Sequence, residues 1–354
     1  MILTGPCQVG KTYMGRQLMS QFKTPLYLNW DIPEDRVRLQ TQSRYDQNDL
    51  VIMDKIHKMT NWKQWLKGIT DAKSPGTALL VTGSARMDTF RQAGESLAGR
   101  YYSYRMHPIS VKELSIDTQI KPREALDHLL ERGGFPEPFL ADQLELVLRW
   151  RTDYAKDILR EDILEFSRLQ ELNTMKIFIE ILGERVGSLL SLASIARDIG
   201  CSPITLSRYL DILQALFVVF TIHPMHDNIA RSLLKTPKVY FYDQGLVRGN
   251  EGAKLENAVA CMLLNLAQEG ERYDLVKVLK GYGGAGVLEV IADNFGDTYR
   301  AVYTVKFSEA IFVLHCFQKK SKQGIATPKE DLNIILSRLK IARLKAKELS
   351  DEKK

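Results

Sequence analysis

The stretch that decides the fold is "MILTGPCQVGKTYMG", residues 1–15 of a chain of 354 residues. Within it, "GPCQVGKT" fits the pattern G-x-x-x-x-G-K-[ST]. An apolar run precedes this motif and an amphipathic stretch follows it, which predicts a strand, a glycine-rich loop and a helix. Backbone N–H groups of such a loop point at phosphates. We therefore expect a nucleotide to be bound by Gly5, Pro6, Cys7, Gln8, Val9, Gly10, Lys11 and Thr12.

Polar residues that follow later apolar runs extend this site. Lys11 would reach the β- and γ-phosphates, and the Thr12 hydroxyl would bind Mg²⁺. Asp54 ends the apolar run "LVIMD" (residues 50–54) and is the expected second contact for the magnesium ion. Ser84 follows "ALLVTG" and is positioned to orient water or the γ-phosphate. The glycine-rich loop, Asp54 and Ser84 each lie at the end of a predicted strand or directly after one. Together they predict that the N-terminal part of the chain binds a nucleotide.

The first third of the chain has an α/β rhythm. Amphipathic stretches separate four apolar runs, which are Met1–Thr4, Pro25–Asn29, Leu50–Asp54 and Thr77–Thr82. This alternation predicts a parallel sheet covered by helices. From Ser110 to about Ile177 the pattern is helical, except at "RGGFPEPF" (residues 132–139), where glycine and proline predict a rigid turn and no helix.

A helix-turn-helix pattern occupies "SLASIARDIGCSPITLSRYLDILQALFVV", residues 191–219. Ala196 and Gly200 are the small residues that two such helices need where they meet. The extended runs Phe217–Ile222 and Lys238–Tyr242 would form a wing. The second helix offers Thr205, Ser207 and Arg208 for DNA contact, but the balanced local charge favours a structural role.

The last part of the chain is basic. The net charge is +6, and residues 301–354 hold 12 Lys and Arg against 6 Asp and Glu. A helix over Leu255–Gln268 leads into a β-rich segment with period-2 alternation, and a Lys-rich helix closes the chain. The excess charge predicts a separate module with a polyanionic partner. A solvated lysine-rich helix is the alternative.

Composition excludes several other classes of protein. No apolar run is long enough to span a membrane. A strand is predicted from the first residues, so we expect no signal peptide. Cys7, Cys201, Cys261 and Cys316 are scattered, which argues against structural zinc and against a disulfide framework. A reducing, cytoplasmic location fits this pattern.

The motifs up to about residue 262 resemble one family as an ordered set. "GPCQVGKT", "YLNWD", "LLVTGSARMD", "GGFPEPFL" and "PKVYFYDQGLVRG" look like bacterial and archaeal AAA-type ATPases, in which a winged helix and a nuclease-like domain follow the ATPase. The resemblance implies ATP as the nucleotide, which would be bound with Mg²⁺, and a winged helix over residues 179–240; a homo-oligomer is a candidate assembly, since AAA modules often need a neighbouring subunit. Arg86 and Arg100 would then contact the γ-phosphate or a neighbouring subunit, unless they form surface salt bridges.

One departure from that family affects catalysis. The family reads Asp-Glu where this chain has Asp54 and Lys55. That Glu polarises the attacking water, and losing a positioned general base costs about 10²–10⁴ in rate. We expect the Lys55 ammonium to lie beside the Asp54 carboxylate and weaken the metal site. Glu95 is the nearby acid we nominate as a substitute, and we expect bound ATP to be hydrolysed poorly.

After residue 264 the chain resembles a second family. "GAGVLEV", "TYRAVYTVKF", "VLHCFQKKS" and "GIATPK" look like the phage-related RelE/HigB-type toxins, over about residues 265–345. The resemblance implies a metal-independent mRNA endonuclease acting on the ribosome; an antitoxin is a candidate partner. Cations would stabilise the charge on the attacked phosphorus; the candidates are Arg300, Lys306, Lys319 and Lys320.

Further residues of this segment have two readings. Tyr303 and Phe317 could stack on bases and His315 could donate a proton. Alternatively, Tyr303 and His315 lie in the core and the lysines protect a sheet edge. A metal-dependent nuclease core fails here, because Ile291 and Thr304 stand where its carboxylates belong.

The predicted fold is multidomain α/β: a P-loop parallel sheet with a helical lid, a winged helix and a C-terminal α+β RelE-like module. The expected boundaries are 1–115 for the ATP-binding domain, 116–178 for the lid, 179–250 for the winged helix, 251–264 for a remnant helix and 265–354 for the toxin-like module. Three functions remain open: ATP binding coupled to an RNA-directed module, DNA-binding regulation through the winged helix, and a catalytically silent interaction protein.

Overall fold

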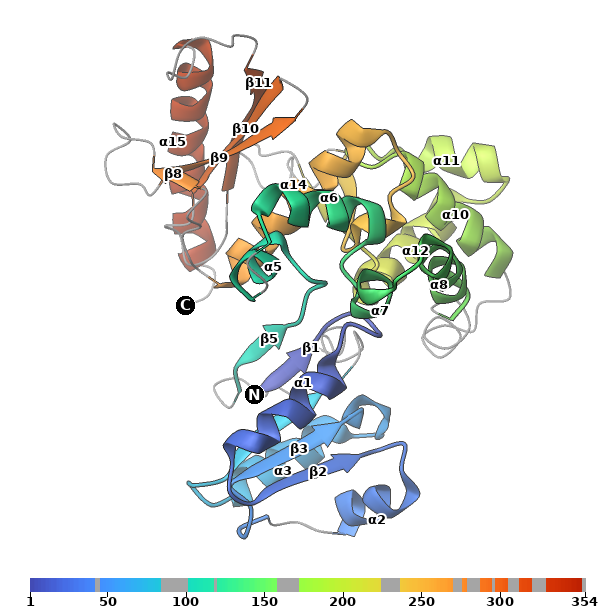
Figure 1. The fold of residues 1–354 in the computed structure, drawn as a ribbon, viewed down its shortest axis with the longest axis vertical. Helices are drawn as coiled ribbons and strands as arrows, with labels where there is room; N and C mark the ends of the chain where they lie inside the picture. Colours follow the sequence, from blue (N-terminus) through green and yellow to red (C-terminus); the bar gives the residue numbers. More distant parts are fainter. Residues whose placement is uncertain are drawn as a thin grey trace. The chain divides into compact units, whose positions relative to one another are not determined.

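The computed structural model describes residues 1–41, 45–83, 101–117, 120–157, 172–223, 236–269, 276–278, 287–294, 297–304, 312–319 and 329–351. The chain divides into two compact units (Figure 1). The first comprises Met1–Ile222 and Pro237–Cys261, and the second comprises His223–Thr236 and Met262–Lys354. The boundary falls within one helix, α14 (Glu251–Glu269).

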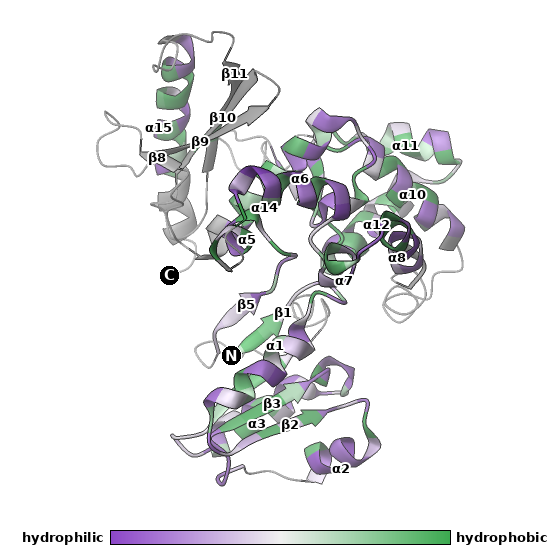
Figure 2. Cartoon of the chain, in the orientation of Figure 1, coloured by the Kyte–Doolittle hydropathy of each residue, from purple (hydrophilic) through white to green (hydrophobic). Residues whose placement is uncertain are grey.

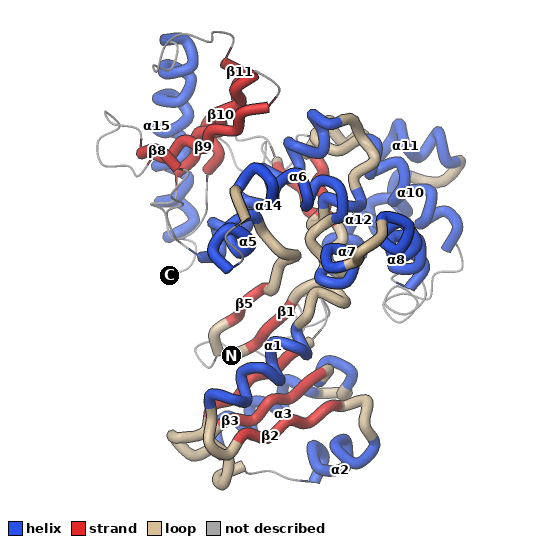
Figure 3. The backbone as a smooth tube through the Cα atoms, viewed as in Figure 1, coloured by secondary structure: helices blue, strands red, loops and turns tan. Residues whose placement is uncertain are grey.

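The first unit begins with a parallel sheet of five strands in the order β2-β3-β4-β1-β5. The strands are β1 (Ile2–Thr4), β2 (Pro25–Asn29), β3 (Leu50–Asp54), β4 (Ala78–Thr82) and β5 (Ser103–Arg105). All neighbours pair in parallel, and helices alternate with strands from β1 to β4 (Figure 3). The predicted parallel α/β sheet and its first four strands are confirmed.

Helices cover both faces of this sheet. They are α1 (Lys11–Leu18), α2 (Pro33–Thr41) and α3 (Trp62–Ala72). Successive residues of β3 point to opposite faces: Val51 and Met53 pack with residues of α3, whereas Leu50 and Ile52 pack with residues of α1. Strands β1 and β3 are accordingly hydrophobic along nearly their whole length (Figure 2), as expected of strands buried on both sides.

Helices dominate the next part of the first unit. They are α5 (Val111–Asp117), α6 (Pro122–Arg132), α7 (Pro136–Leu140), α8 (Leu144–Asp157) and α10 (Leu172–Glu184). The prediction of a rigid turn without helix over residues 132–139 is wrong in its second half. A turn joins α6 to α7, but Pro136 occupies the first position of α7. Proline suits that position because the missing N–H would have no helical partner there.

The helix-turn-helix pattern forms two helices, α11 (Leu192–Ile199) and α12 (Pro203–Ala215). Ser191 and Ser202 cap them by accepting hydrogen bonds from Ser194 and Thr205 backbone N–H groups. Gly200 ends α11 at φ 79°, a conformation that favours glycine. Two antiparallel strands follow, β6 (Val219–Ile222) and β7 (Lys238–Phe241).

The second unit contains an antiparallel sheet and a long helix. The strands are β8 (Val276–Val278), β9 (Val287–Asn294), β10 (Asp297–Thr304) and β11 (Phe312–Lys319), in the order β11-β10-β9-β8. The helix is α15 (Lys329–Asp351), and the guanidinium of Arg338 donates to the Leu314 carbonyl of β11 at 2.8 Å. The predicted β-rich segment and closing helix are confirmed. No helix in the described parts of the chain is long and apolar enough to cross a membrane.

Candidate nucleotide-binding site

The loop between β1 and α1 has a backbone that only certain residues tolerate. Gly5, Gln8 and Gly10 all have positive φ, at 146°, 62° and 102°. A Cβ at Gly5 would lie 2.3 Å from the Met106 carbonyl oxygen, so no other residue fits there. Helix α1 then starts at Lys11 with no side chain capping its first N–H groups. The loop and helix start therefore have the form of a phosphate cradle.

Lys11 lies over this loop. Its Nζ donates to the carbonyl oxygens of Gly5 at 2.9 Å and of Pro6 at 2.5 Å. The ammonium is thus held at the mouth of the loop, where the β- and γ-phosphate oxygens of a nucleotide would meet it.

Asp54, at the end of β3, is a buried carboxylate with three hydroxyl donors. Its side chain is 3% exposed. Thr12 Oγ1 and Tyr27 OH each donate to Asp54 Oδ2 at 2.7 Å, and Thr82 Oγ1 donates to Asp54 Oδ1. These oxygens are the ligand type that Mg²⁺ prefers. The contact between Thr12 and Asp54 brings together the two residues that the sequence assigned to the metal.

Tyr27 and Thr82 were not predicted as site residues. Burial and the hydrogen bond to Asp54 raise the pKa of Tyr27 to about 12, so it stays a neutral donor. Both residues lie at or near the carboxyl ends of strands that flank β3 in the sheet. A parallel register read from the sequence could have identified them, because such strand ends meet at one edge.

The side chain of Lys55 has an ion-pair partner that the sequence analysis did not identify. It has a left-handed backbone (φ 58°), and its Nζ donates to Asp31 Oδ2 at 2.6 Å. The Lys58 ammonium holds Asp31 Oδ1 at 2.7 Å. Lys55 therefore pairs with Asp31, while the Asp54 charge still acts on its ammonium. The expected weakening of the metal site stays a prediction.

The charges of this ion pair support each other. The hydrogen bond to Asp31 raises the pKa of Lys55 despite partial burial. Burial disfavours the charged form of Asp31, but the hydrogen bonds from Lys55 and Lys58 outweigh it and lower the pKa. Lys55 thus stays cationic, and Asp54 keeps its three hydroxyl donors.

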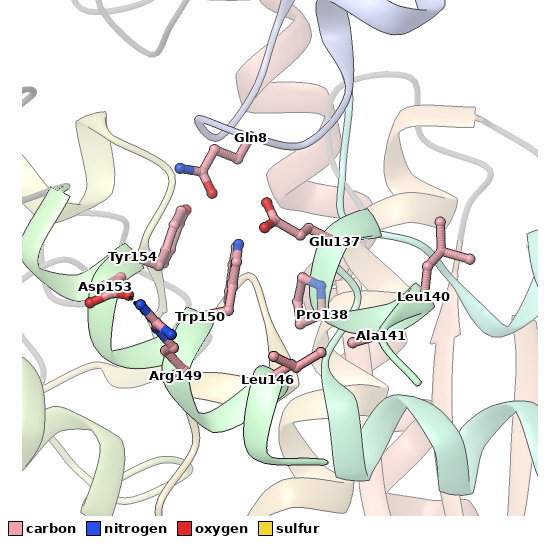
Figure 4. A pocket seen from close by; sticks show the side chains of 10 residues that line it. All are labelled: Gln8, Glu137, Pro138, Leu140, Ala141, Leu146, Arg149, Trp150, Asp153 and Tyr154. Atoms are coloured by element: carbon pink, nitrogen blue, oxygen red, sulfur yellow. Dashed lines mark ion pairs between the residues drawn. The ribbon is translucent and has the colours of Figure 1, made fainter. Parts of the chain in front are cut away.

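A pocket of about 630 Å³ lies beside the loop (Figure 4). Gln8 lines it from the loop, and α7 and α8 supply the other walls; these residues are Glu137, Pro138, Leu140, Ala141, Leu146, Arg149, Trp150, Asp153 and Tyr154. In Figure 4 the Glu137 carboxylate points across the pocket toward Gln8. Trp150 and Tyr154 stack with ring centroids 4.6 Å apart, and Arg149 pairs with Asp153 at 3.8 Å.

A buried carboxylate fixes the turn that leads into α7. Asp243 accepts hydrogen bonds from the N–H groups of Gly134 and Gly245, and it is 1% exposed. Burial raises its pKa to about 6, against the lowering effect of the Gly134 hydrogen bond and the Arg151 charge. Sequence reasoning missed Asp243, because its partner lies 109 residues away in the chain.

Several predicted residues lie outside the described parts of the chain. These are Ser84, Arg86, Glu95 and Arg100 near the nucleotide site, and Lys306 and Lys320 in the second unit. Arg300 lies on β10 and Lys319 on β11. In the strand register Arg300 faces Phe317 and Thr298 faces Lys319, so Arg300 and Lys319 hold positions on the same face of the sheet.

Three family models match the chain. Residues 1–115 match "AAA domain", residues 123–255 match "Domain of unknown function (DUF8612)", and residues 253–340 match "Phage derived protein Gp49-like (DUF891)". The chain thus joins an AAA domain to a Gp49-like domain of the RelE/HigB-like toxin family, and both resemblances drawn from the sequence are confirmed.

The relatives are uncharacterized proteins. One from Mycobacterium tuberculosis is 29% identical over 248 residues, which are 70% of this chain and 54% of the relative. One from Haemophilus influenzae is 27% identical over 64% of this chain and 60% of its own length. The chain therefore spans little more than half of these relatives. Among solved structures, a Walker-type ATPase of Pyrococcus abyssi aligns over 70% of this chain and 89% of its own, at 12% identity and a TM-score of 0.42.

Proposed function

With an AAA domain joined to a Gp49-like domain as the premise, we propose that this chain binds ATP and Mg²⁺ at the loop of residues 5–12 and hydrolyses the ATP slowly. The nucleotide-bound part would serve as a scaffold for a toxin-like module, and that module would act on RNA or the ribosome. The observation that carries the proposal is the contact of Thr12 with Asp54 beside a loop of the phosphate-cradling form.

The residues present fit magnesium as the partner of ATP. Thr12 and Asp54 supply hard oxygen ligands, and the buried Asp54 is kept in place by Tyr27 and Thr82. When bound, the ion neutralises charge on the phosphate oxygens. Lys11 supplies the second positive charge, and the N–H groups at the start of α1 complete the site.

Slow hydrolysis follows from Lys55. In the proposed site no acid follows Asp54, and the ammonium of Lys55 is committed to Asp31. A water molecule at the γ-phosphate would lack the base that usually takes its proton, which costs about 10²–10⁴ in rate.

A Lys55→Glu variant tests this part of the proposal. ATP turnover should rise by about 10² or more if a carboxylate at residue 55 restores the base. Lys55→Ala is the matched control, since it breaks the same ion pair without adding an acid, and its turnover should stay near that of the wild type. Fast turnover by the wild-type chain would contradict the proposal.

We propose an RNA or ribosome partner for residues 265–354, with an antitoxin as a further partner. Support comes from the Gp49-like match and from the basic balance of residues 301–354. Arg300, Lys306, Lys319 and Lys320 are the cations that would neutralise the attacked phosphate.

A second candidate function is DNA binding through residues 179–250 as a winged helix. Two observations favour it. Helix α12 exposes Ile204 (82% exposed), Ser207 and Arg208. The antiparallel strands β6 and β7 follow this helix, in the place of a wing. This candidate is supported if the full chain binds duplex DNA and the Arg208→Ala variant binds it more weakly. If the full chain does not bind duplex DNA, the candidate is ruled out.

A further inference from the structure

The position after Asp54 holds no acid, so a base for ATP hydrolysis must come from elsewhere in the chain. Lys55 fills that position and is bound to Asp31. Among the described residues, the pocket beside the loop brings two carboxylates near the nucleotide site, those of Glu137 and Asp153. They differ in their partners.

Asp153 is already paired, and Glu137 is not. The guanidinium of Arg149 lies 3.8 Å from the Asp153 carboxylate. Within the described parts of the chain, Glu137 makes no hydrogen bond or ion pair, and its side chain is exposed. Its charge is therefore open to a water molecule or a substrate.

The start of α7 lies against the phosphate loop. A Cβ placed on Gly10 would come within 3.9 Å of Pro136 Cγ, and Glu137 is the next residue. Glu137 and Gln8 line the same pocket, and Figure 4 shows the carboxylate directed toward the loop. Lys11 Nζ, which marks the γ-phosphate side, bonds to Pro6, two residues before Gln8.

Two residues just before Glu137 are anchored in the structure. Phe135 is 1% exposed and packs on Trp150 and Tyr154 of α8, with ring centroids 5.1 and 4.7 Å away. The N–H of Gly134 is bound by the buried Asp243. A base must be held within reach of the proton that it takes, and these contacts provide a rigid mount on one side of the pocket.

We propose that Glu137 is the catalytic base of the ATP hydrolysis that this chain retains, in place of the acid absent at residue 55. The proposal rests on the proposed function, since it requires ATP at residues 5–12. In the step, the oxygen of a water molecule bonds to the γ-phosphorus while the bond from that phosphorus to the β–γ bridging oxygen breaks. ADP leaves with the electron pair of that bond, and the Glu137 carboxylate takes one proton from the water.

The test compares Glu137→Gln with wild type in the full chain, using ATP turnover, ATP affinity and trapping of ADP with aluminium fluoride, a mimic of the transferring phosphoryl group. Glu145→Gln is the matched control, since Glu145 lies in the first turn of α8 and does not line the pocket. Circular dichroism melting checks that each variant is folded.

We expect Glu137→Gln to lower turnover about 10²-fold, with unchanged ATP affinity and weaker trapping of the fluoride complex. In a Lys55→Glu background the same change should cost much less, because the carboxylate introduced at residue 55 then supplies a base. Turnover of Glu137→Gln equal to that of Glu145→Gln would overturn the proposal, as would a wild type that binds ATP but turns over no faster than Lys11→Ala. Absence of ATP binding in every variant would instead reject the proposed function itself.

Discussion

Asp54 and Lys55 are neighbours in the chain, yet their side chains enter different networks. Asp54 is buried and accepts three hydroxyl hydrogen bonds, whereas Lys55 is half exposed and pairs with Asp31. An ion pair this exposed contributes only about 0.2–1 kcal/mol to stability. The ion pair matters because it fixes the position of the Lys55 ammonium beside Asp31.

The magnesium role of Asp54 can be tested by Asp54→Asn. The substitution keeps the size of the side chain but removes its charge, so ATP affinity in the presence of Mg²⁺ should fall at least about tenfold, equal to about 1.4 kcal/mol. Without Mg²⁺ the two proteins should bind alike. Asp49→Asn is the control, because Asp49 caps the N–H groups of Lys23 and Thr24 and takes no part in the site. Equal losses with and without Mg²⁺ would contradict the assignment.

Asp243 makes a pH-dependent contribution to stability. Burial raises its pKa from 3.8 to about 6, so between about pH 4 and pH 6 the folded chain holds a proton that the unfolded chain has released. The contribution is therefore fully present below about pH 4 and is lost as the pH rises through about 6. Arg151 and Cys261 are the other titratable groups beside this carboxylate.

The measurement is the free energy of unfolding of wild type and Asp243→Asn between pH 4 and pH 8. The difference, wild type minus variant, should fall as the pH rises to about 6 and then stay level. A difference that rises over pH 4 to 6 would mean that the native environment favours the charged form.

At the scale of elements, one side chain docks α14 onto β7. Asn257 is fully buried; its Oδ1 accepts from the Phe241 N–H at 2.8 Å and its Nδ2 donates to the Phe241 carbonyl at 3.0 Å. The Asn257 amide thus satisfies the backbone N–H and C=O groups of Phe241, as a neighbouring strand would do. Beside it, the Cys261 thiol also contacts the Phe241 carbonyl, at 3.1 Å, and burial raises its pKa.

Asn257→Ala should therefore destabilise the first unit by about 1–3 kcal/mol, since two backbone groups of Phe241 lose their buried partner. Urea unfolding measures the change. Gln40→Ala, at an exposed position of α2, is the control and should change stability by less than about 0.5 kcal/mol. A loss no larger than that of the control would show that water replaces the amide.

The helices and strands that the sequence predicted correctly are those with a clear local signal, either an apolar run or a helix cap. Strands β1 and β3 are buried throughout, β2 and β4 in part, and all four were predicted from apolar runs. Both helices α11 and α12 carry serine caps. Strand β5 was missed, because its residues "SYR" are mostly exposed at the edge of the sheet. Helix α7 was missed because proline was taken as a helix breaker, although it begins a helix readily.

The functional residues divide in the same way. The predicted binding residues Gly5–Thr12 stand in one motif with a fixed local spacing, and Asp54 was predicted from its place at the end of an apolar run. Tyr27, Thr82 and Asp243 make their contacts with distant segments, and Glu137 meets Gln8 only across the pocket, so no local pattern marks these four residues. The ion pair of Lys55 with Asp31 was not predicted for the same reason, since Asp31 follows another strand.

At the scale of the whole chain, the excess positive charge is concentrated near the C-terminal end. The formal charges of residues 1–300 balance, and the +6 belongs to residues 301–354. An RNA-directed function therefore predicts that affinity of the full chain for single-stranded RNA falls steeply with salt. Fluorescence anisotropy with a labelled RNA measures this dependence.

The double variant Arg300→Ala, Lys319→Ala should flatten the slope of log affinity against log salt by about 1 to 1.5, since each phosphate contact to a single strand contributes about 0.7. Lys67→Ala, an exposed lysine of α3, is the matched control and should leave the slope unchanged. If the affinity for RNA depends neither on salt nor on the double variant, the proposal that the toxin-like module binds RNA is contradicted.

The central claim is that residues 5–12 hold ATP, and equilibrium titration of the full chain with ATP and Mg²⁺ tests it most directly. The geometry of Lys11 over the loop predicts saturable binding at one site for the wild type, weakened at least about tenfold in Lys11→Ala, which removes about 1.4 kcal/mol or more. No saturable binding by the wild type, or equal affinity of the two proteins, would contradict the account.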